Sequence, residues 1–260
     1  MSRASGTHLV LIPSYDTGPI LVRTVAQATA FWQPVWVVID GSTDGSGEAL
    51  AAWAQAHQYD LRILHKARNS GKGAAIMFGL EEAARSGYTH ALVMDADGQH
   101  PAASIPEFMA YSRRHPNAMI LGVPAFGADA PALRVRGRRI SNWWVNLETV
   151  WTGIDDSLFG FRVYPIDPLL RIMRERLWMR RFDFDPEAAV RLNWAGVPAR
   201  PRSARVRYLT AAEGGVSHFN YVRDNALLTF MHIRLMLEWL IRWPILVARR
   251  RRLLGRSPSD

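Results

Sequence analysis

Short apolar runs alternate with helix-like segments over the first half of the chain, and this alternation limits the folds open to it. The apolar runs that we predict as strands span residues 8–13, 35–39, 61–64, 91–94 and 120–123. Helical patterns occupy residues 20–30, 48–57 and 73–85 between them. Strands that alternate with helices form βαβ units, which pack into a mostly parallel sheet flanked by helices on both faces. We therefore predict an α/β fold.

The pattern is less regular after residue 125. Residues 126–136 are rich in Gly, Ala and Pro, which is typical of a mobile loop. Predicted helices then span 138–151 and 187–194, and predicted strands span 158–164 and 204–208. We expect residues 1–220 to form one α/β domain, followed by an amphipathic helix and a basic tail over residues 221–260.

Polar side chains follow three of the predicted strands at the point where each strand ends. They lie at residues 14–16, 40–44 and 95–100. In open α/β sheets a ligand binds beyond the carboxyl ends of the strands. The agreement between topology and polarity predicts a binding site at this edge of the sheet.

Two aspartates, Asp95 and Asp97, follow the fourth strand and are separated by one residue. Strand side chains alternate with a period of two, so both carboxylates point in one direction. They repel each other unless a cation lies between them. Gln99 adds a carbonyl oxygen two residues later. Oxygen ligands suit Mg²⁺ or Mn²⁺, which also bind substrate phosphates, so we predict a metal site at these three residues.

The chain carries a formal net charge of +9 and contains no cysteine. The absence of cysteine excludes a disulfide framework, a thiolate metal site and a thiol nucleophile. The densest basic run, residues 249–252, adjoins an apolar segment with tryptophan. This combination favours an anionic membrane surface over nucleic acid as the partner. The N-terminus lacks a signal-peptide pattern, so we expect a cytoplasmic protein that is peripheral on the inner membrane.

Residues 227–247 are apolar enough to raise the question of a membrane span. Arg234, Glu238 and Arg242 interrupt this segment at one-turn spacing, and Pro244 lies near its end. Each charge at the centre of a span costs about 2.5–3.5 kcal/mol on insertion scales. Charges four residues apart share one helix face. We therefore expect an amphipathic helix that lies on the membrane; a helix packed on the protein's own core is the alternative.

Five motifs occur in the order found in family 2 glycosyltransferases. They are Ile12-Pro-Ser-Tyr-Asp, Val38-Ile-Asp-Gly-Ser-Thr-Asp-Gly-Ser, Asn69-Ser-Gly-Lys-Gly-Ala-Ala, Asp95-Ala-Asp-Gly-Gln-His-Pro and Gly160-Phe-Arg. The chain most resembles the dolichol/polyprenol-phosphate mannose synthase-like branch, over roughly residues 8–220. This resemblance implies a GT-A fold and an inverting transfer of sugar from a nucleotide-diphosphate donor. The metal would stabilise the leaving diphosphate.

The resemblance also implies roles for individual residues. Those that would surround the nucleoside are Pro13, Tyr15, Asp16 and Asp40. Lys72 would lie near the donor, Asp95 and Asp97 would form the metal-binding pair with Gln99 as a further ligand, and Arg162 would approach a donor or acceptor phosphate.

The chain departs from its relatives in the acceptor region. It has Phe184-Asp-Pro-Glu where polyprenol-phosphate mannose synthases carry Phe-Gln-x-Glu. It also lacks the arginine of their Arg-x-x-Gly-x-Ser-Lys motif and has His218 after Ser217 in place of the lysine. Ser217 and His218 are therefore candidates for the acceptor side. The acceptor is expected to be lipid-linked or amphiphilic, and the reacting group is left open between a phosphate and a hydroxyl.

Three acidic residues, Asp183, Asp185 and Glu187, lie together in this region. A hydroxyl acceptor must lose a proton as it attacks, and a nearby carboxylate can take that proton. Asp185 is the first candidate for this base and Glu187 the second. Alternatively, Asp185 before Pro186 caps the N-terminus of a helix.

Two other functional classes are compatible with acids at strand ends. A nucleotidyltransferase would need a Gly-rich basic loop after the first strand, which residues 14–18 do not supply. A catalytically inert, membrane-associated nucleotide-sugar binding module is the other alternative. For His100, we consider a structural hydrogen bond more common than a contact with metal or phosphate.

Overall fold

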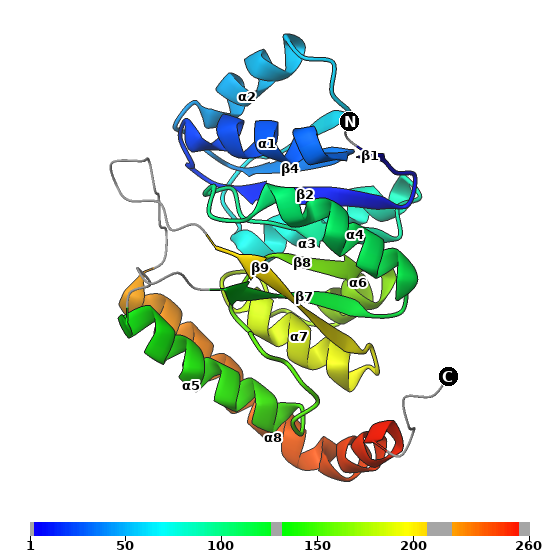
Figure 1. Cartoon of the computed structure of the whole chain (residues 1–260). Helices are drawn as coiled ribbons and strands as arrows, with labels where there is room; N and C mark the ends of the chain where they lie inside the picture. Colours follow the sequence, from blue (N-terminus) through cyan, green and yellow to red (C-terminus); the bar gives the residue numbers. More distant parts are fainter. Residues whose placement is uncertain (1–2, 126–131, 207–219, 255–260) are drawn as a thin grey trace.

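The computed structural model describes residues 3–125, 132–206 and 220–254. A seven-stranded sheet crosses the molecule (Figure 1) in the order β5-β4-β2-β6-β8-β7-β9. Its strands are β2 (His8–Ser14), β4 (Val35–Asp40), β5 (Leu61–Lys66), β6 (His90–Val93), β7 (Met119–Ala125), β8 (Arg162–Pro165) and β9 (Ala199–Arg205). Two short strands, β1 (Arg3–Ala4) and β3 (Trp32–Gln33), pair separately. All pairs are parallel except those of β8, which runs antiparallel to β6 and β7.

Helices cover both faces of the sheet (Figure 1). One face carries α1 (Ile20–Phe31), α2 (Ser46–Gln55), the short 3₁₀ helix η1 (Ala102–Ser104) and α4 (Ile105–Arg114). The other carries α3 (Lys72–Arg85), α6 (Ile166–Arg174) and α7 (Phe184–Trp194). This arrangement confirms the predicted α/β sheet.

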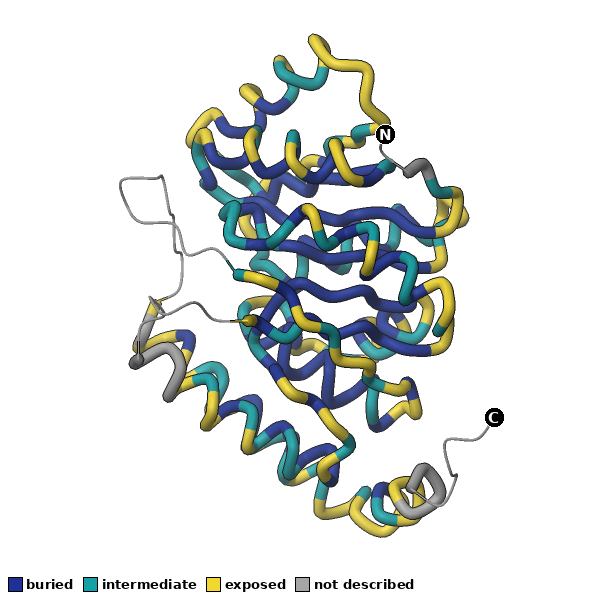
Figure 2. Tube along the Cα trace, viewed as in Figure 1, coloured by how far each residue is buried: buried dark blue, intermediate teal, exposed yellow. Residues whose placement is uncertain are grey.

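Alternation along the central strands divides the core into two layers. On β2, Leu9 and Leu11 pack on the side of α3, whereas Val10 and Ile12 pack on the side of α1. All four are fully buried, and the central strands are dark blue in Figure 2. A strand that is apolar on both faces can be buried only in the centre of a layered sheet. This rigid centre holds the turns that follow β2, β4 and β6.

Two further helices, α5 (Ala132–Glu148) and α8 (Tyr221–Leu254), lie side by side below the sheet in Figure 1. Both also pack against α7. Met231 and Leu235 of α8 and Val145 of α5 are buried in the core layer that includes α7. The C-terminal helix is therefore joined to the domain through α5 and α7.

The largest differences from the predicted boundaries lie after residue 125. The strand predicted at 158–164 begins only at Arg162, because the Asp156 carboxylate accepts the N–H groups of Leu158 and Phe159 and bends the chain there. The strand predicted at 204–208 ends at Arg205 and begins at Ala199, in an edge strand whose arginines hide the apolar alternation. Part of the loop predicted at 126–136 belongs to α5, and residues 126–131 lie outside the described ranges.

Candidate active site

A cleft of about 1390 Å³ opens at the carboxyl ends of β2, β4 and β6. The predicted residues that line it are Pro13, Tyr15, Asp40, Lys72, Asp95, Asp97, Gln99 and Asp185. They come from five separate segments of the chain; the sheet brings four of these segments to one edge, and α7 adds Asp185. The sequence-predicted binding site therefore exists as a single cavity.

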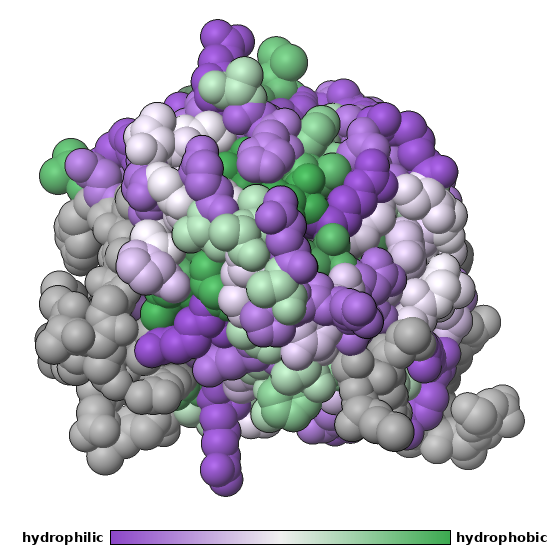
Figure 3. Space-filling model, turned by 90° about the horizontal axis from the view of Figure 1, so that it is seen from above, coloured by the Kyte–Doolittle hydropathy of each residue, from purple (hydrophilic) through white to green (hydrophobic). Residues whose placement is uncertain are grey.

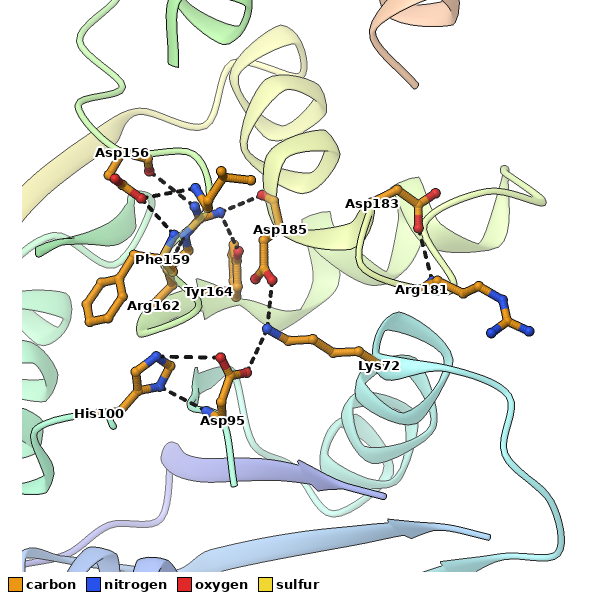
Figure 4. Close-up of polar contacts among 11 residues, drawn as sticks. Lys72, Asp95, His100, Asp156, Phe159, Arg162, Tyr164, Arg181, Asp183 and Asp185 are labelled. Atoms are coloured by element: carbon orange, nitrogen blue, oxygen red, sulfur yellow. Dashed lines mark hydrogen bonds and ion pairs between the residues drawn. The ribbon is translucent and has the colours of Figure 1, made fainter. Parts of the chain in front are cut away.

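Lys72, at the start of α3, connects two acids of the cleft (Figure 4). Its Nζ lies 2.6 Å from Oδ1 of Asp95 and 2.7 Å from Oδ2 of Asp185. Gly160 passes so close that a Cβ at this position would lie 2.8 Å from Nζ and 3.0 Å from Oδ2 of Asp95. The glycine of the Gly160-Phe-Arg motif thus leaves room for the pair formed by Lys72 and Asp95.

Electrostatics distinguish the two acids of the Asp-x-Asp motif. Burial alone would raise the pKa of Asp95, but the Lys72 ammonium beside it lowers that pKa below its ordinary value. Burial, together with the charge of Asp95, raises the pKa of Asp97. Burial alone would lower the pKa of Lys72, yet Asp185 and Asp95 raise it overall. Carboxylates outnumber the ammonium here, so the cleft favours an added cation.

The oxygen groups of Asp95, Asp97 and Gln99 suit a divalent metal that keeps open positions. No group of three or more His, Cys, Asp or Glu side chains that could hold a metal occurs in the described ranges. Two carboxylates and one amide leave coordination sites for water and for diphosphate oxygens. Mg²⁺ in proteins usually keeps several waters and binds substrate phosphates in this way. The mutual repulsion of the two aspartates gives the physical reason for a cation between them.

The side chain of His100 contacts Asp95 through both ring nitrogens. Its Nδ1 accepts the backbone N–H of Asp95 at 2.9 Å, and its Nε2 lies 3.5 Å from Oδ2 of the same residue. The ring is 7% exposed and packs edge-on against Phe159 and Phe161. Both ring nitrogens face Asp95. The geometry therefore supports the structural role of His100, which we considered more common than a contact with metal or phosphate.

Asp40 and Asp16, both predicted to surround the nucleoside, hold loops in place through hydrogen bonds. Oδ2 of Asp40 accepts the N–H groups of Ser70 and Gly71, and Oδ1 lies 3.0 Å from Nζ of Lys66. Oδ1 of Asp16 accepts the N–H of Thr43, which ties the loop after β2 to the loop after β4. Asp16 is not among the residues that line the cleft. These contacts give both acids a structural task beside the predicted one.

Most of the chain matches a known protein family. Residues 9–181, more than half of the chain, match the profile of glycosyl transferase family 2. The chain belongs to glycosyl transferase family 2. The family 2 resemblance drawn from the motifs is thereby confirmed.

Individual family 2 relatives are moderately similar. The polyprenol monophosphomannose synthase of Mycolicibacterium smegmatis is 30% identical over 187 residues, which are 65% of this chain and 66% of that protein. The undecaprenyl-phosphate mannosyltransferase of Micrococcus luteus is 25% identical over 201 residues, which are 70% of this chain and 76% of that protein. The chain thus spans just under two thirds of the first relative's length.

Solved glycosyltransferase structures share the fold. Glucosyl-3-phosphoglycerate synthase from Mycobacterium tuberculosis, in complex with Mn²⁺, UDP-glucose and phosphoglyceric acid, has a TM-score of 0.62 at 13% identity. The match covers 90% of this chain and 80% of that one. Another structure of the same enzyme, with Mg²⁺ and UDP, has a TM-score of 0.57. The GT-A-like fold predicted for this family 2 member is confirmed.

The role predicted for Arg162 is corrected by its burial. The residue is 0% exposed and does not line the cleft. Its guanidinium donates to the backbone carbonyl oxygens of Asp156, Phe159 and Asp185 and to the hydroxyl of Tyr164. These partners engage all three of its nitrogens (Figure 4). Arg162 therefore joins the chain before β8 to the first turn of α7, which carries Asp185, and does not reach a phosphate.

The acid cluster separates into three roles. Glu187 is 0% exposed and accepts hydrogen bonds from Arg191 and Arg234, each at 2.7 Å, so it cannot reach a hydroxyl in the cleft. Asp183 accepts the N–H groups of Met179 and Arg181 and holds a loop against the start of α3. Neither Glu187 nor Asp183 lines the cleft, so the prediction of a base is left with Asp185.

Asp185 alone of the three faces the cleft. Helix α7 begins at Phe184, so the helix N-terminus predicted as the alternative does lie here, with Asp183 at the N-cap position and Asp185 in the first turn. Its Oδ1 is buried and has no hydrogen-bond partner among the described residues. Asp185 remains available to a substrate. Ser217 and His218, the other acceptor-side candidates, lie outside the described residues.

The sequence prediction did not identify the second half of the cleft. This half is lined by Leu158 and by apolar side chains of α5 and α8, which are Ile140, Trp144, Leu228, Ile233, Met236 and Leu237. We refer to this set as the apolar wall. The tryptophan pair at 143–144 was visible in the sequence, but only the packing of α5 on α8 turns its second member toward the cleft. The family 2 site is thus polar at one end and apolar at the other.

The charged row of α8 faces the protein. Arg234 donates to Glu187, and Glu238 accepts two hydrogen bonds from Arg191 of α7. Leu240 and Ile241 are 62% and 82% exposed. The expected amphipathic pattern is present only in part: the charged row packs on α7 beside the buried Met231 and Leu235, and a second apolar face, with Leu240 and Ile241, is exposed. In the basic tail, Arg249 donates to the carbonyl oxygen of Trp194 and so faces the domain. No helix in the described ranges has a stretch long and apolar enough to cross a membrane.

Proposed function

We propose that this family 2 glycosyltransferase moves a sugar from a nucleoside-diphosphate donor to a lipid-linked or amphiphilic acceptor, at the surface of a membrane. The observation that carries the proposal is the continuous cleft, which joins the acids at the strand ends to the apolar wall. A donor diphosphate needs the first environment and an acceptor chain needs the second. The names of the two bacterial relatives, both enzymes of polyprenyl phosphates, support this division.

The donor half has a defined chemical task. Asp95, Asp97 and Gln99 would hold Mg²⁺ or Mn²⁺, which neutralises the charge that develops on the leaving diphosphate. Pro13 and Tyr15 line the end of the cleft nearest to the loops held by Asp40, where a nucleoside would lie. Lys72 keeps Asp95 ionised and oriented toward the same space.

Asp185 is the proposed proton acceptor when the attacking group is a hydroxyl. It lines the cleft, and Lys72 links it to the donor half. In a single displacement, the acceptor oxygen bonds to the sugar's anomeric carbon as the bond to the diphosphate breaks. The hydroxyl proton passes to Asp185, and the bonding electron pair leaves with the diphosphate. A phosphate acceptor would need no base.

Membrane association is proposed from the exposed face of α8. Leu237, Leu240 and Ile241 are 61%, 62% and 82% exposed, and their helical spacing places them on one face. Ile233 and Leu237 belong both to this face and to the apolar wall. An acceptor chain would therefore pass from a lipid layer into the cleft without crossing a polar barrier. By contrast, hydrophilic side chains prevail at the end of the molecule that carries α2 (Figure 3).

A thermal-shift screen of nucleoside diphosphates with and without Mn²⁺ tests the donor half. A ligand at 100 times its Kd stabilises the native state by about 2.7 kcal/mol. We expect one nucleoside diphosphate to raise the melting temperature only when Mn²⁺ is present, and Mn²⁺-dependent hydrolysis of its sugar derivative would exclude an inert binding module. Absence of any Mn²⁺-dependent shift across the uridine, guanosine, thymidine, cytidine and adenosine diphosphates would refute the proposal.

A further inference from the structure

A histidine and a glutamate form a buried pair beside the apolar wall. His232 lies on α8, and Glu148 is the last residue of α5. Nδ1 of His232 lies 2.8 Å from Oε1 of Glu148, and the two side chains are 11% and 0% exposed. The contact joins residues 84 positions apart, so the packing of α5 on α8 creates it. The carboxylate fixes the orientation of the imidazole ring.

The other nitrogen of this histidine has nothing to bind within the described protein. Nε2 of His232 and Oε2 of Glu148 are both buried and lack a hydrogen-bond partner among the described residues. A buried polar atom left in this state costs about 1–3 kcal/mol. The His232 ring also forms part of the cleft lining, next to the ring of Trp144, with the two centroids 6.1 Å apart. A polar group on a molecule in the cleft would satisfy the nitrogen.

A hydroxyl fits this position better than a phosphate. A hydroxyl donates and accepts, so it pairs with Nε2 in either tautomer of the ring, whereas a phosphate oxygen needs an N–H. A phosphate would also add negative charge beside the buried carboxyl group of Glu148. Of the three arginines that line the cleft, two lie within ten positions of Glu148 or His232 in the sequence, and both are paired: Arg138 with Asp156 at 2.6 Å, and Arg223 with Asp224 at 3.0 Å.

We propose that His232 is a specificity-determining residue whose Nε2 hydrogen-bonds to a hydroxyl group of the acceptor, and that Glu148 is the positioning residue that holds the ring. The apolar part of the same molecule lies against Trp144, Leu228 and Met236 of the apolar wall. The inference rests on the proposed function, because it assigns this half of the cleft to an amphiphilic acceptor, and it narrows that acceptor to one that carries a hydroxyl near its chain.

Two soluble amphiphiles with the same chain test the proposal: octyl β-D-glucoside, which offers hydroxyls, and octyl phosphate. Each is titrated below its micelle concentration into the full-length protein and followed by calorimetry. In the variant His232→Leu, we expect octyl glucoside to bind about tenfold more weakly, the value of one hydrogen bond of about 1.4 kcal/mol. Octyl phosphate should keep its affinity. His232→Gln, which retains a hydrogen-bonding group, should recover most of the octyl glucoside affinity. Equal weakening for both probes, or no weakening for either, would overturn the proposal.

A measurement on the unmodified protein tests the same contact if the variants do not fold. With ¹⁵N-histidine labelling, octyl glucoside should shift the Nε2 resonance of His232 and octyl phosphate should not. An Nε2 resonance that ignores octyl glucoside would refute the direct contact. In Glu148→Gln the ring should populate both tautomers, whereas a single unchanged tautomer would remove the positioning role. Nucleotide binding with Mn²⁺ is measured separately on the unmodified protein, so failure of the donor half and failure of this subsite give different results.

Discussion

The two halves of the cleft are built in different ways. The donor half comes from the turns that follow β2, β4 and β6. The acids in these turns accept hydrogen bonds from backbone N–H groups a few residues away or in the adjacent loop. The apolar wall comes from α5 and α8, which meet only through tertiary packing. The donor half therefore depends on the rigid sheet, whereas the acceptor half depends on how α8 docks. A substitution in the contacts that dock α8 should therefore change transfer to the acceptor, whereas nucleotide binding in the donor half should be retained.

The largest expected effect concerns the residue that connects the two halves. Asp185→Asn removes the proposed base and one partner of Lys72, so sugar transfer to a hydroxyl acceptor should fall by about 10²–10⁴, the range for general base catalysis. Release of nucleoside diphosphate in the presence of a lipid extract, corrected for release without it, measures this. The control is Asp167→Asn, an exposed acid in the first turn of α6. Near-normal transfer in Asp185→Asn would instead favour a phosphate acceptor.

The docking contacts of α8 supply the next prediction. Glu187→Ala leaves the guanidinium groups of Arg191 and Arg234 without their shared buried partner. Breaking a buried pair from one side costs about 3–5 kcal/mol. Urea denaturation should show this loss, whereas Glu81→Ala, which breaks a more exposed pair with Arg174, should cost less than about 1 kcal/mol. Equal stability of the two variants would show that the network does not anchor α8.

A smaller effect is expected in the donor half. Asp97→Ala removes one proposed metal ligand from the turn after β6, outside the core, so the fold should persist and Mn²⁺-dependent nucleotide affinity should fall by about a hundredfold. Loss of outer-shell metal contacts alone costs 10–100-fold. Calorimetry with Mn²⁺ measures the affinity, and Asp167→Ala serves as the matched control. Unchanged metal dependence would mean that the Asp-x-Asp pair does not hold the metal.

The smallest expected effect is on membrane attachment. Leu240→Asp places a charge on the exposed apolar face of α8, and losing about 1.5 kcal/mol of apolar burial lowers partition about tenfold. Flotation with vesicles that contain anionic lipid measures it. Phe31→Asp, on the exposed end of α1, should float like the unmodified protein. If the two variants float equally well, α8 does not supply the membrane-facing surface.

The contrast between the halves also explains what the sequence could predict. Asp95, Asp97 and Gln99 were placed in the cleft correctly because they follow the end of a buried strand, which needs no knowledge of the rest of the fold. Arg162 was given the wrong role, because only the packed structure shows its donors turned to three backbone carbonyl oxygens. Local motifs determine which residues lie near one another along the chain, and tertiary packing decides which of them reach the cleft.

The terminal helix illustrates the same limit. The spacing of Arg234 and Glu238 predicted a common face correctly, because helical periodicity is local. The sequence could not show that this face would meet Glu187 and Arg191 of α7. Charges on a helix are usually expected to face water, but here they face partners on α7, and one apolar face of the helix is left exposed. The pair of His232 and Glu148 was missed for the same reason, since its members lie on different helices.

Anomalous X-ray scattering from crystals grown with Mn²⁺ and the nucleoside diphosphate selected by the thermal-shift screen tests the central claim most directly. The account predicts a manganese peak bounded by Asp95, Asp97 and Gln99, in contact with the diphosphate and at the donor end of the cleft. The apolar wall should stay free for an acceptor. Bound nucleotide without a manganese peak at these three residues, or a nucleotide that fills the space along α5 and α8, would contradict the account.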